Sequence, residues 1–127
     1  MPEDRNEGEV GSIRISDEAI AVIAGLAALE VEGVASMAHG TADSFAEMLG
    51  VKTPQRRGVR VEVANEEVAI EINLYVEFGV DIPSVCQKVQ DGVREAVEEM
   101  TGLTVSQVNI SVQGVKLKGT KKENPLG

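Results

Sequence analysis

Residues 59–78, VRVEVANEEVAIEINLYVEF, constrain the fold more than any other stretch of this chain. Apolar side chains occupy every second position on both sides of Asn65-Glu66: Val59, Val61, Val63, then Val68, Ile70, Ile72, Leu74, Val76 and Phe78. Because successive side chains of a strand point to opposite faces of a sheet, this period of two predicts an antiparallel hairpin with one buried and one wet face. Asn65 tolerates the positive φ of a tight turn, although the glycine that usually follows is missing.

An apolar helix is predicted before this hairpin, over residues 17–30. Ser16 or Asp17 is expected to cap its start, and Gly33 marks the break after it. Residues 19–29, AIAVIAGLAAL, contain no polar side chain, so the helix must be covered on more than one side. This run is 11 residues long, whereas a membrane-spanning helix needs about 20, so we expect no direct membrane insertion.

A second helix follows the hairpin, over DIPSVCQKVQDGVREAVEEM. Its valines repeat at a spacing of three and four, and Pro83 lies in the first turn, where its missing amide is tolerated. Short strands are predicted at both ends of the domain, in residues 10–15 (VGSIRI), with Ile13 and Ile15 inward, and in residues 108–112 (VNISV). Residues 41–49, TADSFAEML, predict a short helix.

These elements together predict an α+β fold. Without the short helix the order is βαββαβ, a split βαβ arrangement with two main helices on one face of the sheet. The short extra helix is inserted after the first helix. We expect the domain to occupy residues 10–115, between a disordered acidic N-terminus (residues 1–9) and a flexible lysine-rich tail (residues 116–127).

The composition argues against a nucleic-acid-binding module. The formal net charge is −9, which repels phosphate backbones, and the chain has one Tyr, two Phe and no Trp for base stacking. The single cysteine excludes an intramolecular disulfide and agrees with a cytoplasmic location. The N-terminal residues MPEDRNEGE lack the apolar core of a signal peptide, which also favours the cytoplasm.

No residue pattern in the chain predicts a catalytic, cofactor-binding or metal-binding site. His39 is the one histidine, in a predicted loop, and an isolated histidine is more often structural than a metal ligand. Cys86 lies on the apolar side of the second helix, where a buried structural thiol is the better interpretation. The carboxylates fall on predicted wet faces, and the glycines form no phosphate-binding motif.

Two segments resemble the alkaline shock protein family of Gram-positive bacteria, also described as Gls-type envelope stress response proteins. They are GSIRISDEAIAVIAGLAALEVEGVASM (residues 11–37) and the stretch from GVRVEVANEEVAIEINLYVEF to VNISVQGV (residues 58–115). The resemblance implies a small cytoplasmic protein with no established catalytic activity and a link to cell-envelope stress. It also implies a protein partner, such as a membrane anchor, acetyl-CoA carboxylase or a fatty-acid kinase system.

The sequence therefore favours a non-enzymatic interaction protein that self-associates or binds a protein partner. We expect two contact surfaces, the outer apolar face of the first helix with the short helix beside it, and the wet face of the sheet. The predicted contact residues are Val22, Leu26, Leu29, Phe45, Met48, Glu71 and Tyr75. A small-ligand regulatory domain is the alternative, since βαββαβ folds also serve as sensors.

Overall fold

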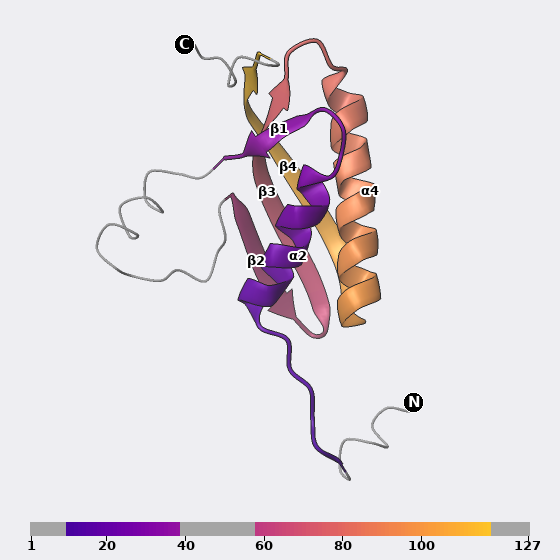
Figure 1. The fold of residues 1–127 in the computed structure, drawn as a ribbon. Coiled ribbons are helices and arrows are strands. Elements are labelled where there is room, and N and C mark those ends of the chain that lie inside the picture. Colours follow the sequence, from indigo (N-terminus) through magenta and orange to yellow (C-terminus); the bar gives the residue numbers. More distant parts are fainter. Residues whose placement is uncertain (1–9, 39–57, 118–127) are drawn as a thin grey trace, which may run out of the picture.

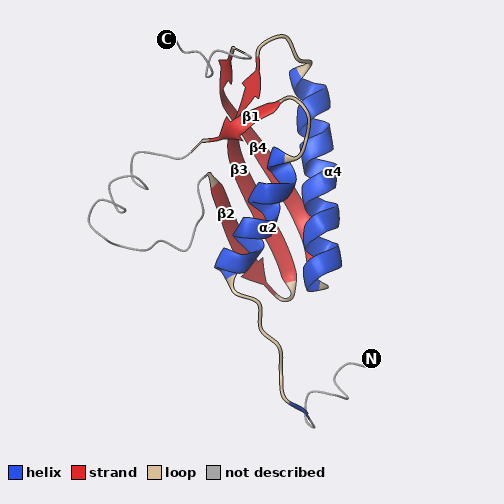
Figure 2. Cartoon of the chain, in the orientation of Figure 1, coloured by secondary structure: helices blue, strands red, loops and turns tan. Residues whose placement is uncertain are grey.

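The structure is a computed structural model, and it describes residues 10–38 and 58–117. Two helices lie wholly within these ranges, α2 (Asp17–Leu29) and α4 (Ile82–Thr101). The strands are β1 (Val34–Met37), β2 (Val59–Ala64), β3 (Glu67–Glu77) and β4 (Thr104–Lys116). Both helices lie on the same face of one sheet, which confirms the predicted α+β class (Figures 1 and 2).

β3 is the central strand of this sheet. β2 pairs antiparallel with its first half and β1 pairs antiparallel with its second half, along the same edge. β4 pairs in parallel with the other edge over the full length of β3, after the chain has crossed over through α4. The ends of β1 and β2 meet at Asn73, whose N–H donates to the Gly58 oxygen (2.7 Å) and whose carbonyl accepts from Ala38 N–H (2.9 Å).

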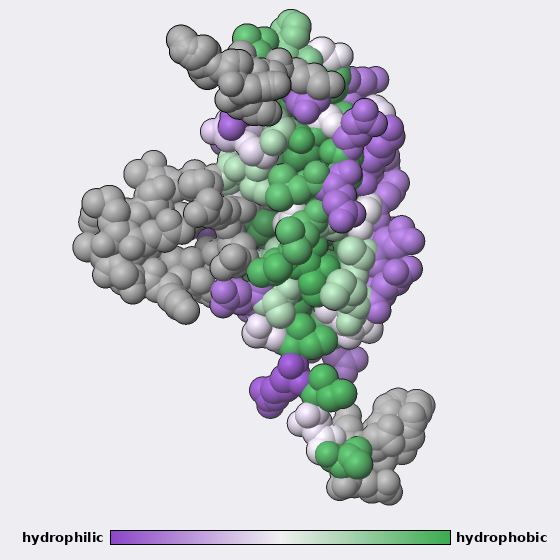
Figure 3. Space-filling model, in the orientation of Figure 1, coloured by the Kyte–Doolittle hydropathy of each residue, from purple (hydrophilic) through white to green (hydrophobic). Residues whose placement is uncertain are grey.

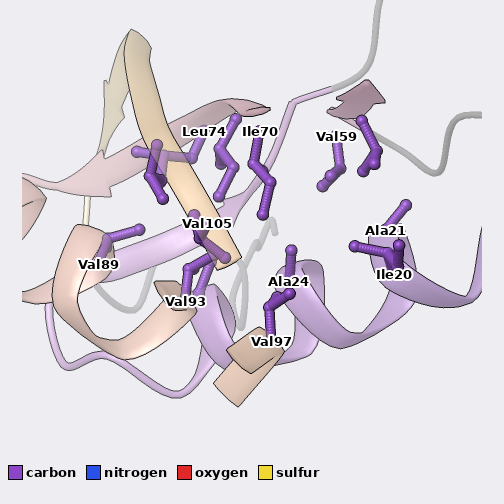
Figure 4. Packing of buried hydrophobic residues seen from close by; sticks show 14 of the residues in the cluster. Ile20, Ala21, Ala24, Val59, Ile70, Leu74, Val89, Val93, Val97 and Val105 are labelled. Atoms are coloured by element: carbon purple, nitrogen blue, oxygen red, sulfur yellow. The ribbon is translucent and has the colours of Figure 1, made fainter. Parts of the chain in front are cut away.

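The core lies between the sheet and the two helices (Figure 4). β3 contributes five side chains that are almost fully buried: Val68, Ile70, Ile72, Leu74 and Val76. α4 covers them with Val85, Val89, Val93 and Val97, and α2 with Ile20, Ala21, Ala24 and Ala28. Burial of one such branched side chain stabilises the fold by about 1.5–3 kcal/mol, so β3 and α4 carry much of the stability.

The predicted first strand is wrong. Residues 11–16 form no helix or strand, and the Ile13 side chain is 91% exposed. β1 follows α2 instead and takes the place beside the second half of β3, so the element order is αβββαβ rather than βαββαβ. The physical reason lies at Ser16, which caps α2 in an extended conformation (φ −72°, ψ 156°) and leads the preceding chain away from the sheet (Figure 1).

Of the other predicted elements, the hairpin and the last strand are present in the structure. The hairpin is confirmed, and its turn residues Asn65 and Glu66 both have positive φ (55° and 66°). The last strand is longer than predicted and reaches Lys116, so the first lysine assigned to the tail is part of β4. The predicted short helix (residues 41–49) lies outside the described residues, as do residues 1–9 and 118–127.

Candidate interaction surfaces

The outer side of α2 presents an apolar surface to its surroundings in the described chain. Leu26 is 59% exposed and Leu29 is 45% exposed, while Val22 is half-buried beside them. Figure 3 shows hydrophobic residues gathered along the length of α2. We call Val22, Leu26 and Leu29 the α2 face.

The position of α2 follows from its small residues. Gly25 lies over β2, where a Cβ at this position would be 3.6 Å from Val59 Cγ2, and Ala21, Ala24 and Ala28 are fully buried. Small side chains allow the helix to approach the sheet closely, and the larger leucines then lie on its outer side. Phe45 and Met48, which were predicted to join this surface, lie outside the described residues.

The open face of the sheet, opposite the helices, is polar and partly ordered by side-chain contacts. The Lys116 ammonium lies 4.7 Å from the centre of the Tyr75 ring, and Lys116 Nζ donates to Ser36 Oγ (3.1 Å). A Cβ on Gly114 would lie 3.1 Å from the Tyr75 ring, so the ring packs closely over this glycine. These contacts hold Tyr75 in place, and a cation over the ring adds about 0.5–1 kcal/mol at an exposed site.

Glu71 lies further along β3 on the same open face. It is exposed, and its cross-strand neighbours are Arg60 on β2 and Asn109 on β4. Between Glu71 and Tyr75, Gln113 Nε2 donates to Ser111 Oγ (2.9 Å) and more weakly to Asn73 Oδ1 (3.4 Å). The structure thus brings Glu71 and Tyr75 to one face of the sheet and the α2 face to the opposite side of the molecule.

The chemically reactive groups of the described residues do not converge. Cys86 is half-buried on α4, and burial raises the pKa of its thiol above the ordinary value, which keeps it protonated at neutral pH. The Glu98 carboxylate accepts from Val105 N–H (2.9 Å) and so fixes the start of β4. Within the described ranges, no three His, Cys, Asp or Glu side chains are grouped to hold a metal ion. His39 lies outside them.

None of the helices in residues 10–38 and 58–117 has the length and apolar character that a membrane crossing requires.

Comparison with known proteins decides the family. Residues 5–117 match the alkaline shock protein 23 family, which is described by its "cell envelope-related function". The chain belongs to this alkaline shock protein family. The match confirms the resemblance found in the sequence, and the matched range contains the α2 face and the whole described sheet.

Relatives of this alkaline shock family chain occur in Gram-positive bacteria. YqhY of Bacillus subtilis, named as an uncharacterized protein, is 36% identical over 120 residues, which cover 94% of this chain and 88% of YqhY. YloU of the same organism is 38% identical over 109 residues, which cover 84% of this chain and 90% of YloU. Streptococcus pyogenes proteins named "Stress response regulator gls24 homolog" are 31% identical over 108 residues, covering 85% of this chain and 60% of theirs. No solved structure matches the chain.

Two features of these surfaces escaped the sequence analysis. Lys116 was assigned to a tail rather than to the open face, and residues 10–15 were assigned to the sheet. The glycine at position 114 was the one available signal for the first, because a missing side chain in a strand often marks a close approach by a neighbour. The second depends on strand pairing, which the sequence pattern does not record.

Proposed function

We propose that this member of the alkaline shock protein family is a non-catalytic interaction protein of the cell-envelope stress response or of envelope homeostasis. It acts by binding a protein partner or further copies of itself. The observation that carries this proposal is the α2 face, where two leucines are about half exposed on a helix that has no polar residue between Ala19 and Leu29. An apolar surface of this kind marks an interaction site when its residues are contiguous.

The chemistry of the surface favours a protein partner. An apolar helix face binds another apolar helix or a groove, because burial of leucine side chains is favourable and needs no matching charge. The net charge of −9 opposes direct binding to anionic lipid head groups or nucleic acid. We therefore infer a cytoplasmic protein that reaches the envelope through its partner. The family resemblance suggests a membrane anchor, acetyl-CoA carboxylase or a fatty-acid kinase system.

The proposal is tested in cells that lack the gene. Such cells are given the wild-type protein, Leu26→Asp, Leu29→Asp or the control Met100→Asp, and are grown under envelope stress such as alkaline medium or a cell-wall antibiotic. Met100 is an apolar residue on α4 rather than α2, and it is somewhat more exposed (68%) than the two leucines. Circular dichroism of each purified variant checks that it is folded, and fractionation measures its recovery with the membrane.

We expect both leucine variants to be folded but to lose stress tolerance and membrane recovery, while Met100→Asp behaves like the wild type. Equal behaviour of all four proteins would contradict a role for the α2 face. In that case, the alternative of a small-ligand regulatory domain would be the better explanation.

A further inference from the structure

Residues 10–14 have the pattern of a strand but pair with no strand among the described residues. Val10 and Ile13 are 83% and 91% exposed, and the segment extends beyond the end of the sheet (Figures 1 and 2). The segment belongs to the family domain, because the match to the alkaline shock protein family begins at residue 5 and includes it. Val10 ends a helical turn, whereas residues 11–16, which include Ile13, form neither helix nor strand. Both large apolar side chains lack cover, and their exposure to water is unfavourable.

The segment is directed away from its own sheet by the two residues that follow it. Ile15 packs against the core, and Ser16 Oγ accepts from Ala19 N–H (3.0 Å) as the cap of α2. A return of residues 10–14 to the sheet of the same chain would need a reversal within Ile15-Ser16. That reversal would remove both the cap and the packing of Ile15, so pairing with the described sheet of the same chain is disfavoured.

The outer edge of β2 has the groups that such a strand requires. Asn73 N–H donates to the Gly58 oxygen, and β2 then pairs residue by residue with β3 from Val59↔Ile72 to Ala64↔Glu67. Because backbone groups alternate in an antiparallel pair, those of Val59, Val61 and Val63 point to the outer edge. Within residues 10–38 and 58–117, no strand pairs with this edge.

We propose that residues 10–14 of one copy add as a strand to the outer edge of β2 in a second copy. Charge favours this edge, because the open face beside it carries Glu62 on β2 and Glu67 and Glu71 on β3 against one positive charge, Arg60, and the segment carries Arg14. With Arg14 beside Glu62, Ile13 lies next to Val61 or Val63 on the other face of the strand. Val63 is 41% exposed, so the added isoleucine covers an apolar side chain that the fold leaves open.

The free edge of β4 is a poorer acceptor for the same segment. Side chains of α4 already use part of it, since Gln90 Nε2 donates to the Val108 oxygen (3.0 Å) and Glu98 accepts from Val105 N–H (2.9 Å). The remaining part ends at Lys116, a positive charge that disfavours Arg14. The dimensions also fit β2, because five extended residues span about 17 Å and β2 itself has six residues.

Each copy thus carries one donor segment and one acceptor edge, which are different surfaces. Contacts of this type produce a pair that exchanges strands reciprocally or a growing chain of copies. The inference deepens the self-association included in the proposed function, and it uses a surface that is separate from the α2 face.

The test measures mass in solution against protein concentration, by light scattering or sedimentation of the full chain. The donor variant is Ile13→Asp, and the acceptor variant is Val63→Pro, which removes an outward N–H without removing a bond to β3. Both sites are on the surface, so circular dichroism should show a folded protein in each case. We expect the wild type to associate and each variant to associate at least about tenfold more weakly, as the loss of one anchor residue implies. The control Met100→Asp should associate like the wild type.

Mixing the two variants gives the sharper result. Ile13→Asp keeps its β2 edge and Val63→Pro keeps its donor segment, so an equimolar mixture should form a complex of one copy of each and nothing larger. A second pair tests the charge contact: Arg14→Glu and Glu62→Arg should each weaken association about five- to tenfold, and the double variant should restore most of it.

Three results would overturn the inference. They are a wild-type protein that stays monomeric, a mixture that forms no complex, and association that is insensitive to both Ile13→Asp and Val63→Pro. Association that is lost in Leu26→Asp but kept in Ile13→Asp would place self-association on the α2 face, which refutes strand addition and still supports the proposed function.

Discussion

The two helices of this protein cover the same sheet, but only one of them is a complete amphipathic helix. α4 places four buried valines on one stripe and charged residues such as Lys88, Asp91 and Glu95 on its exposed side. α2 is apolar on all sides, so the sheet and α4 bury one part of it and leave Leu26 and Leu29 exposed. α4 therefore buries its stripe of four valines within the described fold, whereas α2 leaves part of its apolar surface uncovered by the described residues.

The largest expected loss of stability comes from placing a charge in the buried stripe of α4, compared with the same change on the exposed side of α2. Val93 is fully buried between α4 and the sheet, and Val93→Asp should destabilise the fold by about 3–5 kcal/mol, because an unpaired carboxylate would lie in the core. Leu26→Asp on α2 should cost less than about 1 kcal/mol, since the side chain reaches water. Urea unfolding followed by circular dichroism measures both. Similar losses for the two variants would show that the α2 face is closed in solution.

The second largest loss of stability is expected at Gly58, where the ends of β1 and β2 meet. Gly58 has φ +74°, and a Cβ at this position would overlap the carbonyl oxygen of Ala38, which is backbone and has little room to move. Gly58→Ala should therefore destabilise the protein by roughly 2–3 kcal/mol, through backbone strain and the loss of pairing at Asn73. Gly102→Ala serves as control, because it has a similar φ (+78°) but no atom within 4 Å of the added Cβ. A smaller loss in Gly58→Ala than in Gly102→Ala would contradict this account.

Removal of the helix caps should destabilise the protein less, and it compares the N-terminus of α2 with that of α4. Ser16 Oγ accepts from Ala19 N–H at 3.0 Å, whereas Asp81 Oδ1 accepts from Ser84 N–H at 3.4 Å. Ser16→Ala should cost about 1 kcal/mol. Asp81→Ala should cost less, because its bond is long and the four valines already fix α4. Thermal unfolding of the two variants tests the order, and a larger loss in Asp81→Ala would contradict it.

The smallest expected change in stability is at the turn between β2 and β3, where a substitution to glycine should stabilise the protein. Glu66 has φ +66°, a conformation that costs free energy for a residue with a side chain and none for glycine. Glu66→Gly should raise the free energy of unfolding by roughly 0.5–1 kcal/mol and give the Asn-Gly pair typical of such turns. Glu67→Gly, on the adjacent strand residue, should lower it. A destabilised Glu66→Gly protein would mean that the glutamate side chain has a role in the fold.

The sequence by itself determined the elements whose pattern repeats over many residues. The period of two in residues 59–78 predicted the hairpin, and the period of three to four in residues 82–101 predicted α4, because both reflect which side chains meet the core. The family membership was also predicted correctly, from segments that include both patterns. The outer side of α2 was expected to lie partly exposed for the same local reason, since a helix without polar residues cannot bury its whole circumference against one sheet.

Only the tertiary structure decided which short strand joins β3. Residues 10–15 show the cleaner alternation, yet β1 pairs with β3 instead, and its register is interrupted by a bulge between Val34 and Ser36 that hides its period. Strand pairing depends on which edge is within reach, and the cap at Ser16 directs one candidate away while the turn at Gly33 returns the other to the sheet. The place of Lys116 over Tyr75 was decided in the same way, because β4 continues along β3 beyond the point where its apolar pattern ends.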